Sequence, residues 1–148
     1  MGCCPVQAFS KLTPEDRLDI TELCHRFDQA INRADHTAAG KLFAAHAQVH
    51  HPRGTVQGTE NIVAYFKSVG PMAKGNRHLT VDMVIDPSDS GNRATATSYR
   101  LLHKAALPTM LLASGTIEDE FVKEDGSWHF LVRKFIMDPP VTPPAAAQ

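Results

Sequence analysis

The second half of the chain alternates apolar and polar residues with a period of two, and this pattern constrains the fold more than any other feature. Four such segments follow one another, at about residues 78–85, 94–104, 110–122 and 128–137. Turn-forming residues separate the first pair at 87–92 and the last pair at 124–126. This alternation is typical of strands with one buried face. We therefore expect antiparallel strands, the first with an apolar face of Leu79, Val81, Met83 and Ile85.

The first half of the chain has helical periodicity. Thr13-Pro14-Glu15-Asp16 is a helix start, and apolar residues then recur at helical spacing to about residue 33. Asp35 can cap a short second helix that buries Ala39, Leu42 and Phe43. A strand at about 47–51 then ends in a pair of histidines, and a third helix runs from 58–59 to about 70–71. Three helices followed by an antiparallel meander indicate an α+β fold, in which a sheet curved around a helix makes a cone with an open mouth.

Length and charge narrow the class of protein. The chain has 148 residues, which suits one domain, and we expect a flexible lead at 1–12, the domain at 13–138 and a Pro-rich tail at 139–148. The net charge of −1 gives no electrostatic footprint for nucleic acid. No apolar run is long enough to span a membrane.

The N-terminus and the cysteines bear on location. The start MGCC invites a lipidation interpretation, but position 6 is Val where the myristoylation pattern has Ser or Thr. Three cysteines, two of them adjacent, make a poor disulfide framework, which favours reduced thiols and a cytoplasmic protein.

Eight histidines make proton transfer a natural hypothesis, because imidazole titrates near neutral pH. Alternation sends His50 and His51 to opposite faces of their strand, so at most one enters the cavity directly. Tyr99 and His103 share a face with Leu101, and Arg100 is on the other face. In an apolar cavity Tyr99 and His103 would offer hydrogen-bond donors to an oxyanion. Three roles stay open for Arg53: it closes the mouth, it holds a carboxylate or enolate, or it is an ordinary surface residue near a turn. The spacings support no metal site and no nucleotide-cofactor motif.

Five segments, in this order and spacing, resemble the SnoaL-like branch of the NTF2-like superfamily: RFDQAINRAD, KLFAAHAQVHHPRG, QGTENIVAYF, NRHLTVDMVID and EDGSWHFLVRKF. The resemblance covers about residues 13–138. It implies three helices packed on a curved, mainly antiparallel sheet that encloses a cavity, and a homodimer formed through the outer face of the sheet. Similar proteins include scytalone dehydratase, ketosteroid isomerase and polyketide cyclases, and also non-catalytic transport and scaffold proteins.

The resemblance also implies roles for single residues. His51 matches the position of the proton-shuttling base in ketosteroid isomerase, and His78 matches the base of scytalone dehydratase. The Asp that orients the latter base is matched here by Asn32, which can accept an imidazole N–H but cannot stabilise an imidazolium by charge. Asp28 or Asp82 could substitute for it. Phe27 replaces the oxyanion-donating Tyr of ketosteroid isomerase, which disfavours a plain steroid isomerase.

We therefore expect a cofactor-independent acid–base enzyme, an isomerase, cyclase or dehydratase, acting on a hydrophobic polycyclic small molecule of secondary metabolism. His78, positioned by Asn32, and His51 would transfer protons, while Tyr99, His103 or Arg53 would bind the oxyanion or orient the substrate. The apolar walls would come from Phe27, Ile31, Leu101 and Met110. Two alternatives stay open: a binding module with the same cavity and no turnover, and a purely structural dimerisation domain whose cavity is filled by side chains.

Overall fold

The structure is a computed structural model that describes residues 12–141, the side chain of Met72 excepted. Three helices are present in this part of the chain: α1 (Pro14–Asn32), α2 (His36–Gly40) and α3 (Thr59–Ala73). They accompany one sheet built from the strands β1 (Phe43–His51), β2 (Gly54–Gln57), β3 (Asn76–Pro87), β4 (Arg93–Lys104), β5 (Leu111–Glu124) and β6 (Ser127–Met137). The N-terminal MGCC and most of the predicted Pro-rich tail lie outside the described residues.

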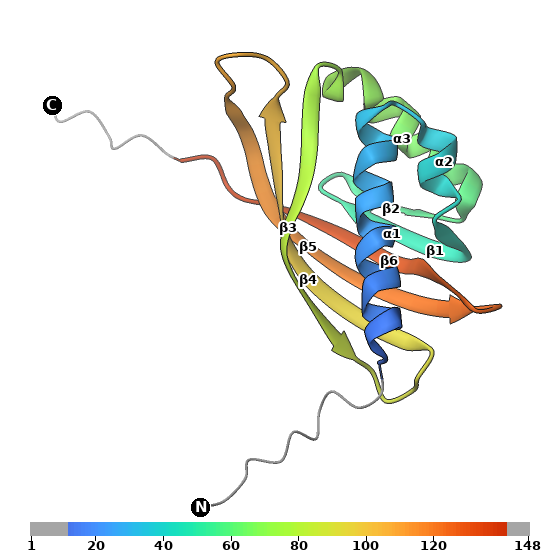
Figure 1. The fold of residues 1–148 in the computed structure, drawn as a ribbon. Coiled ribbons are helices and arrows are strands. Elements are labelled where there is room, and N and C mark those ends of the chain that lie inside the picture. The colour runs from blue at the N-terminus through green and yellow to red at the C-terminus, as the bar shows by residue number, and fades with distance from the viewer. Residues whose placement is uncertain (1–11, 142–148) are drawn as a thin grey trace, which may run out of the picture.

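The sheet has the strand order β2-β1-β6-β5-β4-β3. All neighbours pair antiparallel except β1 and β6, which are parallel. The sheet curves around α1, while α2 and α3 lie together at one end of the cone (Figure 1). The predicted α+β cone of helices on a curved, mainly antiparallel sheet is confirmed.

Helix α1 begins where the sequence indicates. The Thr13 hydroxyl accepts a hydrogen bond from the Asp16 N–H, and the Asp16 carboxylate accepts one from the Thr13 N–H, so the two residues form a capping box. Its buried face carries Ile20, Leu23 and Phe27 into the concave side of the sheet. There, Phe27 meets the rings of Phe43, Phe66 and Phe130 edge-on at centroid distances of 5.4–5.9 Å, an arrangement that aromatic pairs favour.

Three boundaries differ from the sequence-based expectation. Phe43, expected in the second helix, instead begins β1, and β2 was not expected at all. Helix α3 continues through Pro71 to Ala73 instead of ending near Gly70.

The expected apolar face of β3 is also wrong in part. The register of β3 against β4 shifts between Val81 and Val84, where Asp82 adopts a φ of 51°. Such a bulge inserts an extra residue and exchanges the two faces of a strand. Leu79 is therefore exposed on the outer face, whereas Ile85, beyond the bulge, is buried.

Candidate functional site

A cavity of about 340 Å³ opens between the helices and the concave side of the sheet. This volume lies in the range of small-molecule sites. Helices α1 and α3 supply Phe27, Ile31, Tyr65 and Phe66 to its wall, and the strands β3, β4 and β6 supply His78, Arg100, Leu102, Phe135 and Met137. His36, His51 and Arg53 also line it. A cavity filled by side chains, which a purely structural domain predicts, is not what the structure has.

Asn32 holds both the backbone and the ring of His78. β3 is an edge strand, so the peptide groups on its free side need partners from outside the sheet. The His78 N–H donates to Asn32 Oδ1 at 2.8 Å, and Asn32 Nδ2–H donates to the His78 carbonyl at 3.0 Å. One helical turn earlier, Asp28 Oδ2 accepts the Thr80 N–H at 2.7 Å. Asp28 and Asn32, one helical turn apart on α1, thus bind the backbone of Thr80 and His78, two residues apart on β3.

These backbone bonds determine the tautomer of His78. They orient the Asn32 amide, because a backbone N–H must meet its oxygen and a backbone carbonyl its nitrogen. Asn32 Oδ1 also lies 3.2 Å from His78 Nδ1, and an amide oxygen can only accept. His78 Nδ1 therefore carries the proton, and Nε2 is left with a lone pair.

The surroundings keep this imidazole neutral. Burial, together with the charge of the nearby Arg100 guanidinium, lowers the pKa of His78 to about 3. With an amide in place of a carboxylate at position 32, no negative charge on Asn32 opposes this effect. His78 is consequently a hydrogen-bond acceptor throughout the physiological pH range.

His51 has the opposite tautomer. The Arg53 N–H donates to His51 Nδ1 at 3.2 Å, so that nitrogen is unprotonated and neutral His51 carries its proton on Nε2. The ring stacks on Tyr65 with a centroid distance of 4.1 Å, and burial with the Arg53 charge lowers the pKa of His51. His50 instead lies 2.9 Å from the Thr55 hydroxyl and does not line the cavity, which confirms that the two histidines diverge.

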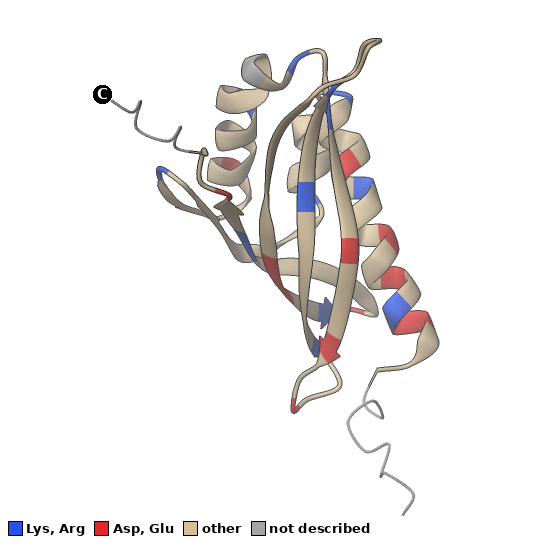
Figure 2. Ribbon diagram, turned by 90° about the vertical axis from the view of Figure 1, so that its left-hand side faces the viewer, with Lys and Arg blue, Asp and Glu red and all other residues tan. Residues whose placement is uncertain are grey.

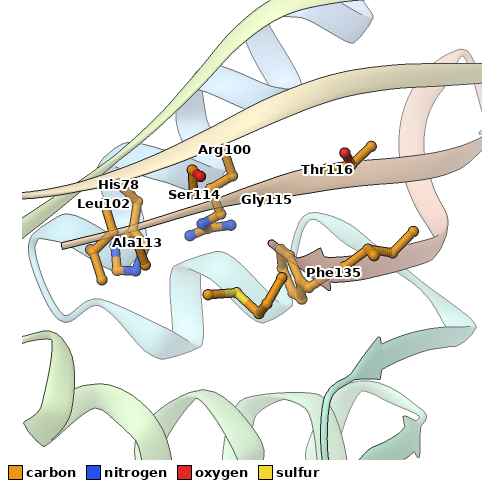
Figure 3. Close-up of a pocket in the computed structure, with 10 residues that line it drawn as sticks. His78, Arg100, Leu102, Ala113, Ser114, Gly115, Thr116 and Phe135 are labelled. Atoms are coloured by element: carbon orange, nitrogen blue, oxygen red, sulfur yellow. The ribbon is translucent and has the colours of Figure 1, made fainter. Parts of the chain in front are cut away.

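Arg100 is the cavity residue that the sequence-based reasoning placed on the wrong face. Its Cζ lies 4.9 Å from the centroid of Phe135, and Figure 3 shows Arg100, His78 and Phe135 on the same side of the strands. A signal for this orientation is present in Ala94, Ala96 and Ser98, all buried on the same face of β4. Small residues of this kind mark a face that packs closely against a helix.

Behind the cavity wall lies a second buried cation. Arg133 is fully buried, with Cζ 4.3 Å from the ring of Phe27 and 4.6 Å from that of Phe130. Its Nε lies 3.5 Å from Asp119 Oδ1. Burial raises the pKa of Asp119 to about 6, although Arg133 opposes the shift. The interior behind the wall thus holds Arg133 beside Asp119, and both Asp28 and Asp119 act electrostatically on Arg100.

The other predicted site residues fall outside the cavity lining. Tyr99, Leu101 and His103 alternate with Arg100 and Leu102, and the latter pair faces inward, so the expected orientation of the former is wrong. Tyr99 is 55% exposed, and His103 Nδ1 contacts the Lys104 carbonyl and the Thr109 hydroxyl. Met110 is exposed in the loop between β4 and β5. Asp82, at the bulge, is exposed as well.

A metal-ligand cluster and a membrane-spanning helix are both absent from the part of the chain that the structure describes. Residues 12–141 contain no cluster of three or more metal-ligating side chains. No helix in this region combines the length and apolar character needed to cross a membrane.

The fold has many solved relatives. A protein of unknown function from Nostoc punctiforme is 26% identical, with a TM-score of 0.81 over 86% of this chain and 95% of the other. ActVI-ORFA of Streptomyces coelicolor is 19% identical, with a TM-score of 0.75 over 82% and 97%. A candidate scytalone dehydratase of Novosphingobium aromaticivorans is 20% identical, with a TM-score of 0.72 over 90% and 96%. The last two likenesses show the fold alone.

No curated protein matches the sequence. The model of the SnoaL-like domain, however, matches residues 13–134, nearly the whole of the described chain. The chain belongs to the SnoaL-like family.

Proposed function

We propose that the protein catalyses cofactor-independent proton transfer on a hydrophobic, polycyclic carbonyl compound, as an isomerase, cyclase or dehydratase. The observation that carries this proposal is that the lone pair of His78 Nε2, the Arg100 guanidinium and His51 all belong to one largely apolar cavity. The SnoaL-like family includes enzymes of these three kinds, which supports the choice of reaction class.

In the proposed reaction, His78 Nε2 takes a proton from a carbon next to the substrate carbonyl. The electron pair of the broken C–H bond moves into the carbonyl group and forms an enolate, whose oxygen Arg100 stabilises. Burial is the main cause of the low His78 pKa, and the Arg100 charge adds to it. The negative charge of the enolate offsets the contribution of Arg100, so the imidazole becomes more basic as the oxyanion forms. Return of the proton to another carbon gives an isomer, and loss of a β-hydroxyl as water gives a dehydrated product. The Nε2–H of His51 would donate a hydrogen bond to a second oxygen atom of the substrate.

Hydrogen–deuterium exchange tests this step without knowledge of the natural substrate. Tricyclic and tetracyclic ketones in D₂O would be followed by NMR for enzyme-dependent loss of the protons next to the carbonyl. We expect His78→Gln to lower the exchange rate by roughly 100-fold or more. His46→Gln is the matched control, because His46 is exposed on β1 and does not line the cavity. Equal exchange in wild type and His78→Gln would refute the role of His78.

One observation favours the rival function of a binding module. Asn32 supplies no charge to stabilise an imidazolium, and the pKa of His78 is far below neutrality. A binding protein would use the same atoms as fixed hydrogen-bonding partners. Submicromolar binding of a ketone without any enzyme-dependent exchange would favour this function over catalysis.

We further propose a homodimer through the outer face of the sheet. Val81, Tyr99, Thr116 and Ile136 are successive cross-strand partners there, and Tyr99 and Ile136 are exposed, as is the nearby Leu79. Figure 2 shows long uncharged stretches on these strands. Light scattering should give a dimer mass for wild type and a monomer mass for Tyr99→Glu. A wild-type monomer at high micromolar concentration would contradict the dimer.

A further inference from the structure

The wall of the main cavity is cationic. Two arginines line it, Arg100 on β4 and Arg53 between β1 and β2, and no Asp or Glu is among its lining residues. His51 and His78 also line it but are not counted as cations, because burial lowers the pKa of both. Asp28 and Asp119, the buried carboxylates near Arg100, do not line it. A cation-lined, largely apolar cavity attracts anions and repels cations, and its low dielectric strengthens both effects.

Arg100 is not saturated by the protein. Within residues 12–141, its Nη1 is buried without a hydrogen-bond partner, and none of the ion pairs there includes it. Asp28, whose charge acts on Arg100, accepts the Thr80 N–H with Oδ2, and its Oδ1 is buried without a hydrogen-bond partner among the described residues, so the two groups attract each other without forming a hydrogen bond. A buried N–H of a guanidinium without an acceptor costs free energy, which an acceptor on a ligand would recover.

There is also space for such an acceptor. A smaller hollow of about 80 Å³ meets the main cavity at His78, Arg100 and Leu102. Its other side is formed by residues 113–116 of β5, where Gly115 is the cross-strand partner of Arg100 and the side chains of Ser114 and Thr116 belong to the opposite face of the strand. At Gly115, which lines the hollow, a Cβ would clash with the Ile136 carbonyl oxygen, so the close approach of β5 and β6 requires a glycine here. The size of the hollow suits a compact group beside Arg100, the only Lys, Arg, Asp or Glu among its lining residues, whereas the larger main cavity has room for a ring system.

We infer that the ligand of this cavity is a hydrophobic carboxylate, with its rings in the main cavity and its carboxylate paired with Arg100 in the smaller hollow. This inference rests on the cavity of the proposed function and goes beyond it, because proton transfer next to a carbonyl requires only a neutral ketone. Arg100 binds the ligand through a charge that is present before any reaction begins. Arg53, at the mouth, increases the rate at which the anion enters.

Calorimetry with a matched pair of ligands tests the inference. 2-Naphthoate and 2-naphthamide share their ring system and differ in charge, so we expect the carboxylate to bind roughly tenfold more tightly or better. Arg100→Gln should remove this preference and leave the amide affinity within about twofold. Arg93→Gln makes the same substitution at an exposed arginine of the same strand and should keep the preference. Arg100→Lys, which keeps the charge, should retain part of it and serves where Arg100→Gln fails to fold.

The outcomes separate this inference from the proposed function. Equal affinities for the two ligands would overturn the carboxylate inference and leave proton transfer on neutral ketones intact. A carboxylate preference that survives Arg100→Gln would assign the charge recognition elsewhere and also overturn it. Failure of both ligands and of every polycyclic ketone to bind the folded wild type would overturn the proposed function as well.

Discussion

Replacing Asn32 by Asp should convert the neutral His78 into a group that titrates closer to neutrality. Asn32 Oδ1 lies 3.2 Å from His78 Nδ1. A full negative charge at that distance would stabilise an imidazolium by about 5 kcal/mol at an effective dielectric constant of about 20, which is an upper bound because the carboxylate is itself desolvated. Neighbouring opposite charges typically shift a pKa by roughly 1–3 units. We therefore expect the pKa of His78 to rise from about 3 to a value of roughly 4–6.

The same substitution should weaken the fold. The Asn32 amide also donates to the His78 carbonyl at 3.0 Å, and a carboxylate would put an oxygen against that carbonyl. Loss of a half-buried donor of this kind costs about 1–3 kcal/mol of unfolding free energy. Asn32→Asp should therefore lower the stability of the edge strand β3 and raise the pKa of His78.

Two measurements follow this variant: the His78 ring-proton shift against pH by NMR, and urea unfolding at pH 7. Asn61→Asp is the matched control, because the exposed Asn61 amide also donates to a backbone carbonyl, that of Gln57. It should leave the His78 pKa unchanged and the stability within about 0.5 kcal/mol. A His78 pKa that stays at the wild-type value in Asn32→Asp would refute the proposed contact between the amide oxygen and Nδ1.

Two further predictions concern stability. The folded pKa of His78 lies below its ordinary value of 6.5, so the unfolded chain binds the extra proton and stability attributable to His78 is lost as the pH falls from 6.5 toward 3, by up to about 1.4 kcal/mol per pH unit. The raised pKa of Asp119 acts in the opposite sense between pH 3.8 and about 6, so the effect of His78 is isolated by comparing wild type with His78→Gln. From pH 6.5 to pH 4.5, urea unfolding should show wild type losing about 2 kcal/mol more unfolding free energy than the variant does. Parallel curves of stability against pH for the two proteins would contradict this prediction. Asp16 accepts from Lys123 Nζ at 2.8 Å and Trp128 Nε1 at 2.9 Å, and the Lys123 charge holds the pKa of that carboxyl well below its usual range. Asp16→Asn should lower the unfolding free energy at pH 7 by about 2–4 kcal/mol, followed by Trp128 fluorescence, whereas Asp19→Asn on the exposed face of α1 should have little effect; equal stabilities would refute the role of this network.

The sequence predicts the fold well because the fold depends on periodicity and on caps. The capping box at Thr13 and the alternation of the last strands are local features, and the structure contains both. The resemblance of five ordered segments to the SnoaL-like branch further predicted that the curved sheet and the helices enclose a cavity. The short β2 escaped prediction because its four residues are mostly exposed and show no alternation.

The site is harder to predict because it depends on which of the alternating residues of each strand face inward. Alternation identifies two faces on β4 but does not say which is inside, and the Tyr99 face offered more obvious chemistry than the Arg100 face. On β3, the bulge at Asp82 exchanges the faces partway along the strand, which a period-two pattern cannot show. His51 and His78 could be proposed because the resemblance to the SnoaL-like branch matches both to proton-transferring residues. Tyr65, a member of the apolar side of α3, gave no sign that it would stack on His51.

One cavity holds His78 with its proton on Nδ1 and His51 with its proton on Nε2. Long-range ¹H–¹⁵N NMR of the imidazole rings at pH 7 distinguishes these tautomers, because protonated and unprotonated ring nitrogens have well-separated shifts. We expect a protonated Nδ1 and an unprotonated Nε2 for His78, unchanged down to about pH 4.5, and the reverse tautomer for neutral His51. A His78 ring that is protonated on Nε2 at pH 7, or that titrates near pH 6.5, would contradict this expectation.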